Sequence, residues 1–241
     1  MKFTIERTVS PHDLGINNIA TASAILRYMQ EAAFMHMAAC PPSMDQLRAE
    51  NKAFIISKLS MSIYGTLRAC DEIKISTWAC DSKGYSFLRC ARIEKDGLIV
   101  AEMETVSALV DITDRKLLRV SDSPQSYTTE LPIELDMPAR IRVPQNVNLS
   151  LAGEHTVTYT DCDLNHHINN THYPDLICGF LPSMEKKRVE KMAISYMNEA
   201  PLSQTIKVYV SEEEDGTIWV RTVREDGTPN VECEIVLDDM I

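Results

Sequence analysis

Residues 21–39 read TASAILRYMQEAAFMHMAA and form the first long periodic segment of the chain. The apolar residues that recur there at three- and four-residue spacing are Ala22, Ile25, Leu26, Met29, Ala33 and Met37. This spacing places them along one face of a helix, which a folded chain turns toward its interior. Pro41 and Pro42 follow, and prolines at this point end a helix. The sequence therefore predicts a helix over residues 21–39 with one buried face.

The residues after these prolines follow a different period. Residues 58–63 and 73–78 alternate between polar and apolar side chains, and residues 98–112 form a longer segment after a turn at residues 95–97. A two-residue period indicates β-strands, and short turns between them are typical of antiparallel pairing. The first half of the chain therefore predicts a strand, a helix and then several antiparallel strands.

A proline-rich stretch at residues 121–150 separates the two halves. Its prolines are Pro124, Pro132, Pro138 and Pro144. Proline at this density is incompatible with a central strand, so we expect a connector that lies over the surface. The first order of elements then returns, with hairpin signals at Asp215-Gly216 and Asp226-Gly227. The predicted elements are a strand at 155–159, a helix at 170–181 and strands at 206–210, 218–222 and 231–237.

The two halves also share short residue matches, which favour an internal duplication. With a small gap, the matched dipeptides are Thr8-Val9 with Thr156-Val157, Asp13-Leu14 with Asp163-Leu164, and Asn17-Asn18 with Asn169-Asn170. A helix wrapped by a curved antiparallel sheet, present twice, resembles the α+β arrangement called a tandem, or double, hotdog. We expect an N-terminal hotdog at residues 1–125, a linker at 126–150 and a C-terminal hotdog at 151–241. Fusion of the two copies would replace a homodimer, because one copy leaves its helix and sheet edges uncovered.

Composition excludes several functional classes. The net charge of −11 argues against a nucleic-acid partner, which requires a concentrated basic surface. No apolar run approaches the length of a membrane helix, and the first residues are polar, so we expect a cytoplasmic protein without membrane insertion. The seven cysteines are scattered without a Cys-x-x-Cys pair, which favours reduced, packed thiols over disulfides or a zinc site.

The densest polar segment, residues 161–173, reads DCDLNHHINNTHY and lies between a predicted strand and a predicted helix. Turns and helix N-caps favour Asn and Asp, but a turn has no need of three histidines. Carboxylates, imidazoles and amides together are the groups of general acid–base catalysis. Adjacent histidines do not match the usual ligand spacing, so we expect neither a metal nor another cofactor.

This segment resembles the signature of the acyl-acyl-carrier-protein (acyl-ACP) thioesterase family, in which Asp-x-Asn-x-His is followed by Asn-Asn and Tyr. The matching residues are Asp163, Asn165, His167, Asn169, Asn170 and Tyr173. A second element of the family, a Tyr shortly before a Glu, is matched by Tyr196 and Glu199. Residues 26–33 and 71–78 resemble the first helix of the family and its turn into a strand that ends at a tryptophan.

The resemblance implies hydrolysis of a fatty acyl-ACP to a free fatty acid and holo-ACP, with acyl carrier protein as partner. It places Asp163, Asn165 and His167 toward the acyl carbonyl and brings Glu199 from the facing strand. Glu199 with His167 would activate water or act as the nucleophile, and Asp163 would orient its neighbours. Plant members carry a cysteine directly after this glutamate, whereas this chain has Ala200, so a Cys-His mechanism is excluded at that position. A homodimer of the fused chain is a further expectation.

The resemblance also places the acyl-chain pocket in the N-terminal hotdog. Met29, Met35, Met37, Met61 and Met103 fit either such an irregular apolar pocket or a plain core, and substitution near Met29 is expected to shift the preferred chain length.

Three alternatives remain open. A hotdog hydratase would show Asp-x-Asn-Pro-x-His, but His166 rather than proline follows Asn165. An acyl-coenzyme A thioesterase would differ only in the carrier. A non-catalytic acyl-binding sensor would not need Asp163, Asn165, His167 and Glu199 together.

Overall fold

The computed structural model describes residues 2–123, 128–135 and 141–240. Its helices, 3-10 turns included, are η1 (Pro11–Asp13), α1 (Ala22–Ala39), α2 (Met44–Ala49), η2 (Val120–Asp122), η3 (Tyr159–Asp161), η4 (Asn170–His172) and α3 (Tyr173–Cys178). Its strands are β1 (Phe3–Thr8), β2 (Lys52–Ile63), β3 (Glu72–Ala79), β4 (Phe87–Lys95), β5 (Leu98–Asp111), β6 (Lys116–Leu118), β7 (Leu149–Thr156), β8 (Lys187–Tyr196), β9 (Thr205–Ser211), β10 (Thr217–Arg224) and β11 (Pro229–Asp239).

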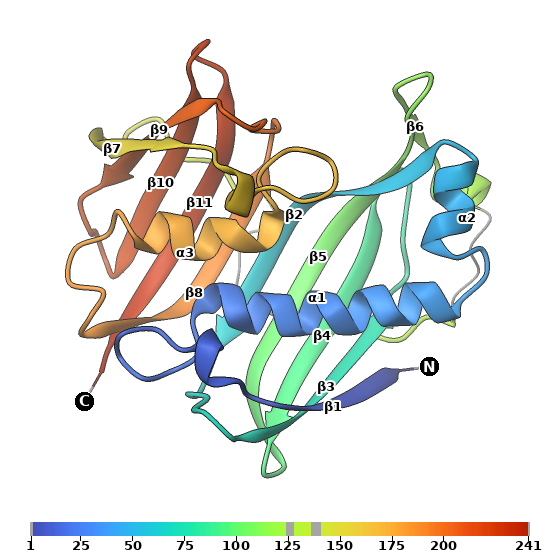
Figure 1. Ribbon diagram of the computed structural model, residues 1–241, viewed down its shortest axis with the longest axis horizontal. Coiled ribbons are helices and arrows are strands. Elements are labelled where there is room, and N and C mark those ends of the chain that lie inside the picture. The colour runs from blue at the N-terminus through green and yellow to red at the C-terminus, as the bar shows by residue number, and fades with distance from the viewer. Residues whose placement is uncertain (1, 124–127, 136–140, 241) are drawn as a thin grey trace.

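All strands of the described residues belong to one antiparallel sheet with the order β1-β3-β4-β5-β2-β8-β11-β10-β9-β7, and β6 pairs with β5 (Figure 1). From one edge to the centre the strands are β1, β3, β4, β5 and β2, and from the other edge they are β7, β9, β10, β11 and β8. These two series correspond strand by strand. The centre of this symmetry is the β2–β8 pair, where Ser60 lies opposite Ala193. The two halves therefore share a continuous sheet, which confirms the predicted α+β double hotdog.

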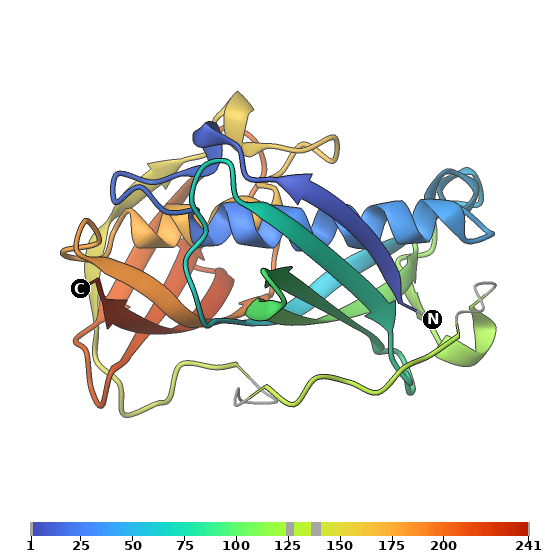
Figure 2. The same cartoon turned by 90° about the horizontal axis from the view of Figure 1, so that it is seen from below.

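Helix α1 crosses the inner face of the first half, and α3 covers the same face of the second half (Figures 1 and 2). Ile25, Leu26 and Met29 are almost completely buried between α1 and the sheet. The side chain of Thr21 accepts a hydrogen bond from the Ala24 amide at 3.1 Å and caps the helix. The predicted helix and its buried face are confirmed.

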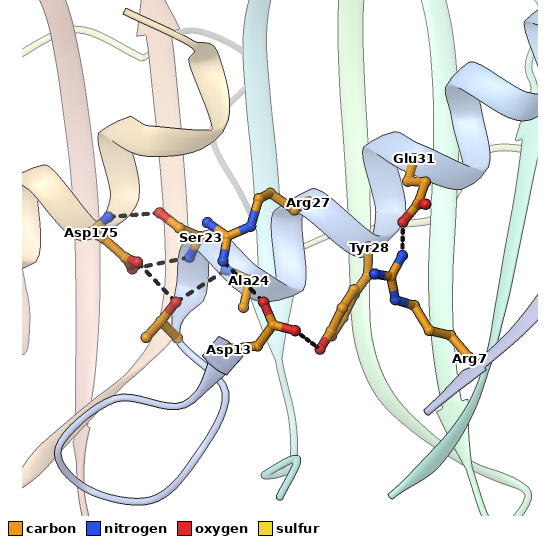
Figure 3. A network of polar contacts seen from close by, with 9 residues as sticks. Arg7, Asp13, Ser23, Ala24, Arg27, Tyr28, Glu31 and Asp175 are labelled. Carbon is orange, nitrogen blue, oxygen red and sulfur yellow. Dashed lines mark hydrogen bonds and ion pairs between the residues drawn. The ribbon is translucent and has the colours of Figure 1, made fainter. Parts of the chain in front are cut away.

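Polar contacts tie the start of α1 to α3 (Figure 3). One carboxylate oxygen of Asp175 accepts a hydrogen bond from the Thr21 hydroxyl at 2.9 Å, and the other accepts from the Ser23 amide at 3.2 Å. In return, the Ser23 hydroxyl accepts from the Asp175 amide at 2.9 Å. A buried Tyr28 donates to Asp13 at 2.7 Å one turn further along α1. The bonds of Asp175 thus join the start of α1 to α3, and the Tyr28 bond joins α1 to η1.

The connector runs along the outer face of the sheet, opposite the helices (Figure 2). Trp78 donates its indole N–H to the Leu131 carbonyl at 2.9 Å, and the Val143 amide donates to Glu232 at 3.2 Å. Described parts of the connector therefore lie over the sheet as predicted. Pro124 and Pro138 fall outside the described residues.

Three strands, β4, β6 and the central β8, were not among the predicted elements. In β8 the consecutive residues Met192, Ala193 and Ile194 are all buried, because both faces of this central strand are covered and the two-residue period is lost. Arg92 interrupts the apolar pattern of β4, and its charge is matched by Glu102 on β5 at 2.5 Å. Apolar periodicity alone misses strands of these two kinds.

Two predicted boundaries in the second half are wrong. The strand predicted at 155–159 is β7, which begins at Leu149 and ends at Thr156. The helix predicted at 170–181 ends at Cys178 and consists of η4 followed by α3. Pro174 lies in the first turn of α3, where its missing N–H leaves no helical bond unmade.

The structure also corrects the internal alignment. The carbonyl of Asp13 accepts from the Thr21 amide at 3.0 Å, and the carbonyl of Asp161 accepts from the Asn169 amide at 2.9 Å. The counterpart of Asp13 is therefore Asp161 rather than Asp163, and the two loops align without the predicted gap. A dipeptide match is too short to fix such a register.

Candidate active site

Residues 162–168, which carry His166 and His167, form a small hairpin between η3 and η4. Its ends meet in an antiparallel bridge between Cys162 and Ile168. At its tip the His166 amide donates to the Asp163 carbonyl at 3.0 Å, and His166 has a left-handed backbone conformation with φ of 63°. Three-residue hairpin loops commonly end in a residue of this conformation. This turn places Asp163 and His167 next to each other.

The hairpin is held against the chain that continues from β8. The Ile168 amide donates to the Ala200 carbonyl at 3.0 Å, and the Leu202 amide donates to the His166 carbonyl at 3.0 Å. Glu199 directly precedes Ala200 and therefore lies beside the hairpin.

His167 lies between two carboxylates. Its Nδ1 is 3.2 Å from the Ile168 carbonyl oxygen and 4.0 Å from Asp163 Oδ1, while its Nε2 is 3.8 Å from Glu199 Oε1. Because Nδ1 faces a carbonyl, it carries the hydrogen, and Nε2 is left as the basic nitrogen on the Glu199 side. The Glu199 side chain is 67% exposed against 20% for His167, so an incoming carbonyl has access from that side.

Asn165 is held by its neighbours on both sides. Its amide N–H donates to Asp163 Oδ1 at 2.8 Å and its side-chain NH₂ donates to Oδ2 at 3.3 Å. Its Oδ1 accepts from Arg48 on α2 at 3.3 Å. The four residues predicted from the sequence (Asp163, Asn165, His167 and Glu199) are thus brought together, and Arg48 joins them from the first half.

A buried amide that the sequence analysis missed supports the Glu199 segment. Asn230 is fully buried at the start of β11, and its NH₂ group donates to the Asn198 carbonyl at 2.5 Å and to the Tyr173 hydroxyl at 2.9 Å. Its Oδ1 accepts from the Thr222 hydroxyl at 2.8 Å. An asparagine directly before the apolar alternation of β11 is the sequence signal that could have pointed to it.

Neither the position after Glu199 nor the cysteine at the end of α3 supplies a reactive thiol. Ala200 is buried and occupies this position. Burial raises the pKa of the Cys178 thiol on α3 to about 12, so this group stays protonated and is a poor nucleophile at neutral pH. The geometry is therefore that of a carboxylate and imidazole site.

Two histidines outside the candidate site, His36 and His155, have structural partners. His36 is buried, stacks on Phe3 with ring centroids 5.3 Å apart and lies 3.0 Å from an Arg89 guanidinium nitrogen. Burial and the Arg89 charge lower its pKa to about 4. His155 lies 3.0 Å from Asp161. In the part of the chain that the structure describes, no group of three His, Cys, Asp or Glu side chains could hold a metal ion.

A cavity of about 510 Å³ lies in the first half beneath α1. Its lining comes from α1, α2 and strands β2 to β5, and includes Gln30, Ala33, Phe34, Met37, Met44, Phe54, Ile56 and Met103. Met29 and Met61 belong to the core instead, and Met35 is exposed. The α1 side chains that line this cavity are thus Gln30, Ala33, Phe34 and Met37, whereas Met29 lies outside its lining. A shift of chain length on substitution near Met29 stays a prediction.

The fold and the site define a class of hotdog protein. Two fused copies share one sheet, and only the second copy carries the polar group of Asp163, Asn165, His167 and Glu199. The chain belongs to the acyl-ACP thioesterase family: the model of the Acyl-ACP thioesterase N-terminal domain matches residues 1–127, and that of the C-terminal domain matches residues 145–237.

Curated relatives are plant enzymes. The chain is 24% identical over 216 residues to an oleoyl-acyl carrier protein thioesterase 2 from Arabidopsis thaliana, covering 79% of this chain and 58% of the relative. It is 21% identical over 218 residues to a dodecanoyl-[acyl-carrier-protein] hydrolase from Cinnamomum camphora, covering 83% and 56%. The chain thus spans less than two thirds of the length of these relatives.

Solved structures share the fold. An acyl-ACP thioesterase from Bacteroides thetaiotaomicron superposes with a TM-score of 0.89 at 18% identity over 98% of both chains. A 12:0-ACP thioesterase from Umbellularia californica superposes with a TM-score of 0.84 at 12% identity, covering 99% of this chain and 98% of that one. Among the described residues, no helix is both long and apolar enough to cross a membrane.

Proposed function

We propose that the protein hydrolyses fatty acyl-ACP to a free fatty acid and holo-ACP. The observation that carries this proposal is the position of His167 between Asp163 and Glu199, in a chain that also contains a large apolar cavity. Names of the plant relatives and the family assignment support the same reaction and the same carrier. The division of labour follows the predicted halves: residues 1–125 bind the acyl chain and residues 151–241 supply the reacting groups, with 126–150 as linker.

Hydrolysis requires a base for water and a donor for the oxyanion. A water molecule within hydrogen-bond distance of both His167 Nε2 and Glu199 would lose its proton to this pair as it attacks the thioester carbon. Glu199 would stabilise the imidazolium that forms, and the hydrogen bond from Nδ1 to the Ile168 carbonyl keeps the ring oriented. The side-chain amide of Asn165 is the nearby donor for the oxyanion, and one such donor contributes about 3 kcal/mol. The C–S bond breaks as the tetrahedral intermediate collapses, and the leaving thiolate of the carrier takes up the proton held by the His167 imidazolium, which restores the base.

Glu199→Gln and His167→Asn test this assignment, with Glu225→Gln as the matched control at another exposed glutamate of the second half. Thiol release is measured with acyl-ACP and acyl-coenzyme A of equal chain length. We expect wild type and the control to hydrolyse acyl-ACP, and each site variant to lose about 100-fold or more in kcat.

The alternative functions give different results. Hydrolysis of acyl-coenzyme A alone would assign the protein to the coenzyme A thioesterases. Tight binding of both substrates without thiol release would favour an acyl-binding sensor. After a single turnover in ¹⁸O water, label in Glu199 would identify it as the nucleophile, because only attack of water on the glutamyl carbon of an acyl–Glu199 anhydride places the label there. A cytoplasmic location and a homodimer stay predictions, which cell fractionation and analytical ultracentrifugation check.

A further inference from the structure

The first half contains a counterpart of the catalytic hairpin with the same backbone geometry. The Gly15 amide donates to the Ile19 carbonyl at 2.9 Å, as the Asp163 amide donates to the His167 carbonyl at 3.1 Å. The tip residue Asn18 has a left-handed φ of 59°, close to the 63° of its counterpart His166. The hairpin at residues 14–20 therefore superposes on that at residues 162–168 with a constant offset.

The neighbouring segments correspond as well. The Ala20 amide donates to the Leu67 carbonyl at 2.8 Å, as the Ile168 amide donates to the Ala200 carbonyl at 3.0 Å. Thr66, which precedes Leu67, therefore occupies the place of the residue before Ala200. The pairs of equivalent positions are Gly15 and Asp163, Asn17 and Asn165, Ile19 and His167, and Thr66 and Glu199.

This counterpart has lost the groups that hydrolysis needs. Glycine, isoleucine and threonine replace the two carboxylates and the imidazole, so neither a base nor its orienting partner remains at Gly15, Ile19 and Thr66. Only the amide is retained, and Asn17 donates its NH₂ group to the Lys187 carbonyl at 3.2 Å. The first-half hairpin, called the silent site below, therefore keeps the backbone geometry of its counterpart but lacks the groups that hydrolysis needs.

A second cavity opens at this silent site. It has a volume of about 270 Å³, roughly half that of the first, and lies between the loop at residues 15–22 and α3. Its apolar lining includes Ile16, Ile19, Ala22, Leu67 and Met184. The charged lining residues are Asp175, Glu185, Lys187 and Arg188, so an apolar interior is combined with groups of both signs.

We propose that this second cavity is a non-hydrolytic binding site for a medium-chain fatty acid. The apolar lining would bury the acyl chain, and the ammonium group of Lys187 would bind the carboxylate of the fatty acid. This carboxylate would compete with Glu213, whose carboxylate oxygen lies 3.2 Å from the Lys187 ammonium group. The smaller volume favours a shorter chain than the first cavity takes. The choice of a fatty acid rests on the proposed function, since it is the product released a short distance away in the same chain.

Isothermal titration with decanoic acid tests the stoichiometry. Wild type is expected to bind two equivalents. Gly65→Leu is expected to bind one, because Gly65 lines the second cavity and a Cβ there would meet no atom closer than 3.7 Å, which leaves the added side chain room to enter the cavity. Ala33→Leu, which narrows the first cavity, is expected to lose the other equivalent. Ala38→Leu adds the same atoms at an exposed site on α1 and is the control.

Photo-crosslinking gives an independent readout on unmodified protein. Decanoic acid with a diazirine at its chain end should label peptides that contain Ile19 or Met184 as well as peptides from the first cavity. One equivalent in wild type, with label confined to the first cavity, would overturn the proposal. If Gly65→Leu does not fold, Ala22→Leu at the same cavity replaces it. Two equivalents in a protein that releases no thiol would leave this inference standing and refute the proposed hydrolysis instead.

Discussion

Asn230→Val should uncouple the Glu199 segment from the core. The substitution installs the residue found at the equivalent place in the first half, because the carbonyl of Val100 accepts the same pair of backbone N–H bonds as that of Asn230. Valine fits a β-strand, so the backbone itself need not change. What disappears is the amide that holds the Asn198 carbonyl at 2.5 Å and the Tyr173 hydroxyl at 2.9 Å.

The magnitude follows from the groups left without a partner. The Asn198 carbonyl and the hydroxyls of Tyr173 and Thr222 lose their bonds to Asn230, and an unsatisfied buried polar group costs about 1–3 kcal/mol. Added apolar contact from valine offsets part of this, so we expect a loss of about 3 kcal/mol in the free energy of unfolding. For a chain of this size that lowers Tm by roughly 6–12 °C. A displaced Glu199 should lower kcat by about 10- to 100-fold.

Calorimetry and thiol release on the same preparations decide the case. KM should change little, because the proposed acyl cavity lies in the other half. Thr222→Val, which removes one hydroxyl bonded to Asn230 at 2.8 Å and leaves the amide in place, is the milder comparison. A lower Tm with kcat within a factor of two of wild type would refute the positioning role and leave Asn230 as a purely structural residue.

Three other perturbations follow from the structure. The pKa of His36 is about 4 in the folded chain and 6.5 in the unfolded one, so the unfolded chain binds more protons in between and stability falls as the pH drops from 6.5 to 4. After allowance for solvent screening, the free energy of unfolding falls by roughly 2 kcal/mol over this range. In His36→Phe, the free energy of unfolding measured by chemical denaturation should change less with pH. Arg48→Met removes the 3.3 Å bond to Asn165 and should lower kcat/KM about fivefold with Tm unchanged; an unaltered kcat/KM would exclude a role for α2. Asp175→Ala breaks the contacts to Thr21 and Ser23 and should cost about 1–2 kcal/mol of stability in urea titration; no change would show that helix packing alone joins α1 to α3.

Periodicity predicts the elements in which apolar and polar residues alternate regularly along the sequence. Helix α1 and strands β2 and β3 were found in this way. Residues 59–63 of β2 are all buried, but the alternation is kept because the residues between the apolar ones are the small polar Ser60 and Ser62. Strand β8 lacks this signal because both of its faces are covered. It is nevertheless the strand through which the two halves join, so the most important pairing of the fold was the least visible in the sequence.

The candidate site shows the same limit. The spacing within residues 161–173 places three of its residues together, because one hairpin carries them. Arg48 and Asn230 are distant in sequence and come close only through the pairing of β2 with β8 and of β8 with β11. Local sequence patterns hold no information on such encounters. A residue that positions a catalytic group from another strand is therefore found from the structure.

Fusion of the two copies explains why the halves could diverge. In a homodimer each copy has the same sequence, so a change that enlarges one cavity also alters the other, and each catalytic loop must be retained twice. In the fused chain, α1 has 18 residues and covers a cavity of about 510 Å³, whereas α3 has 6 residues beside a cavity of about 270 Å³. The half with the longer helix has lost its polar groups, and the half with the shorter helix has kept them. The first half thus need not keep the polar groups, and the second half need not keep the large cavity. Two copies of identical sequence in a symmetric dimer could not divide these requirements.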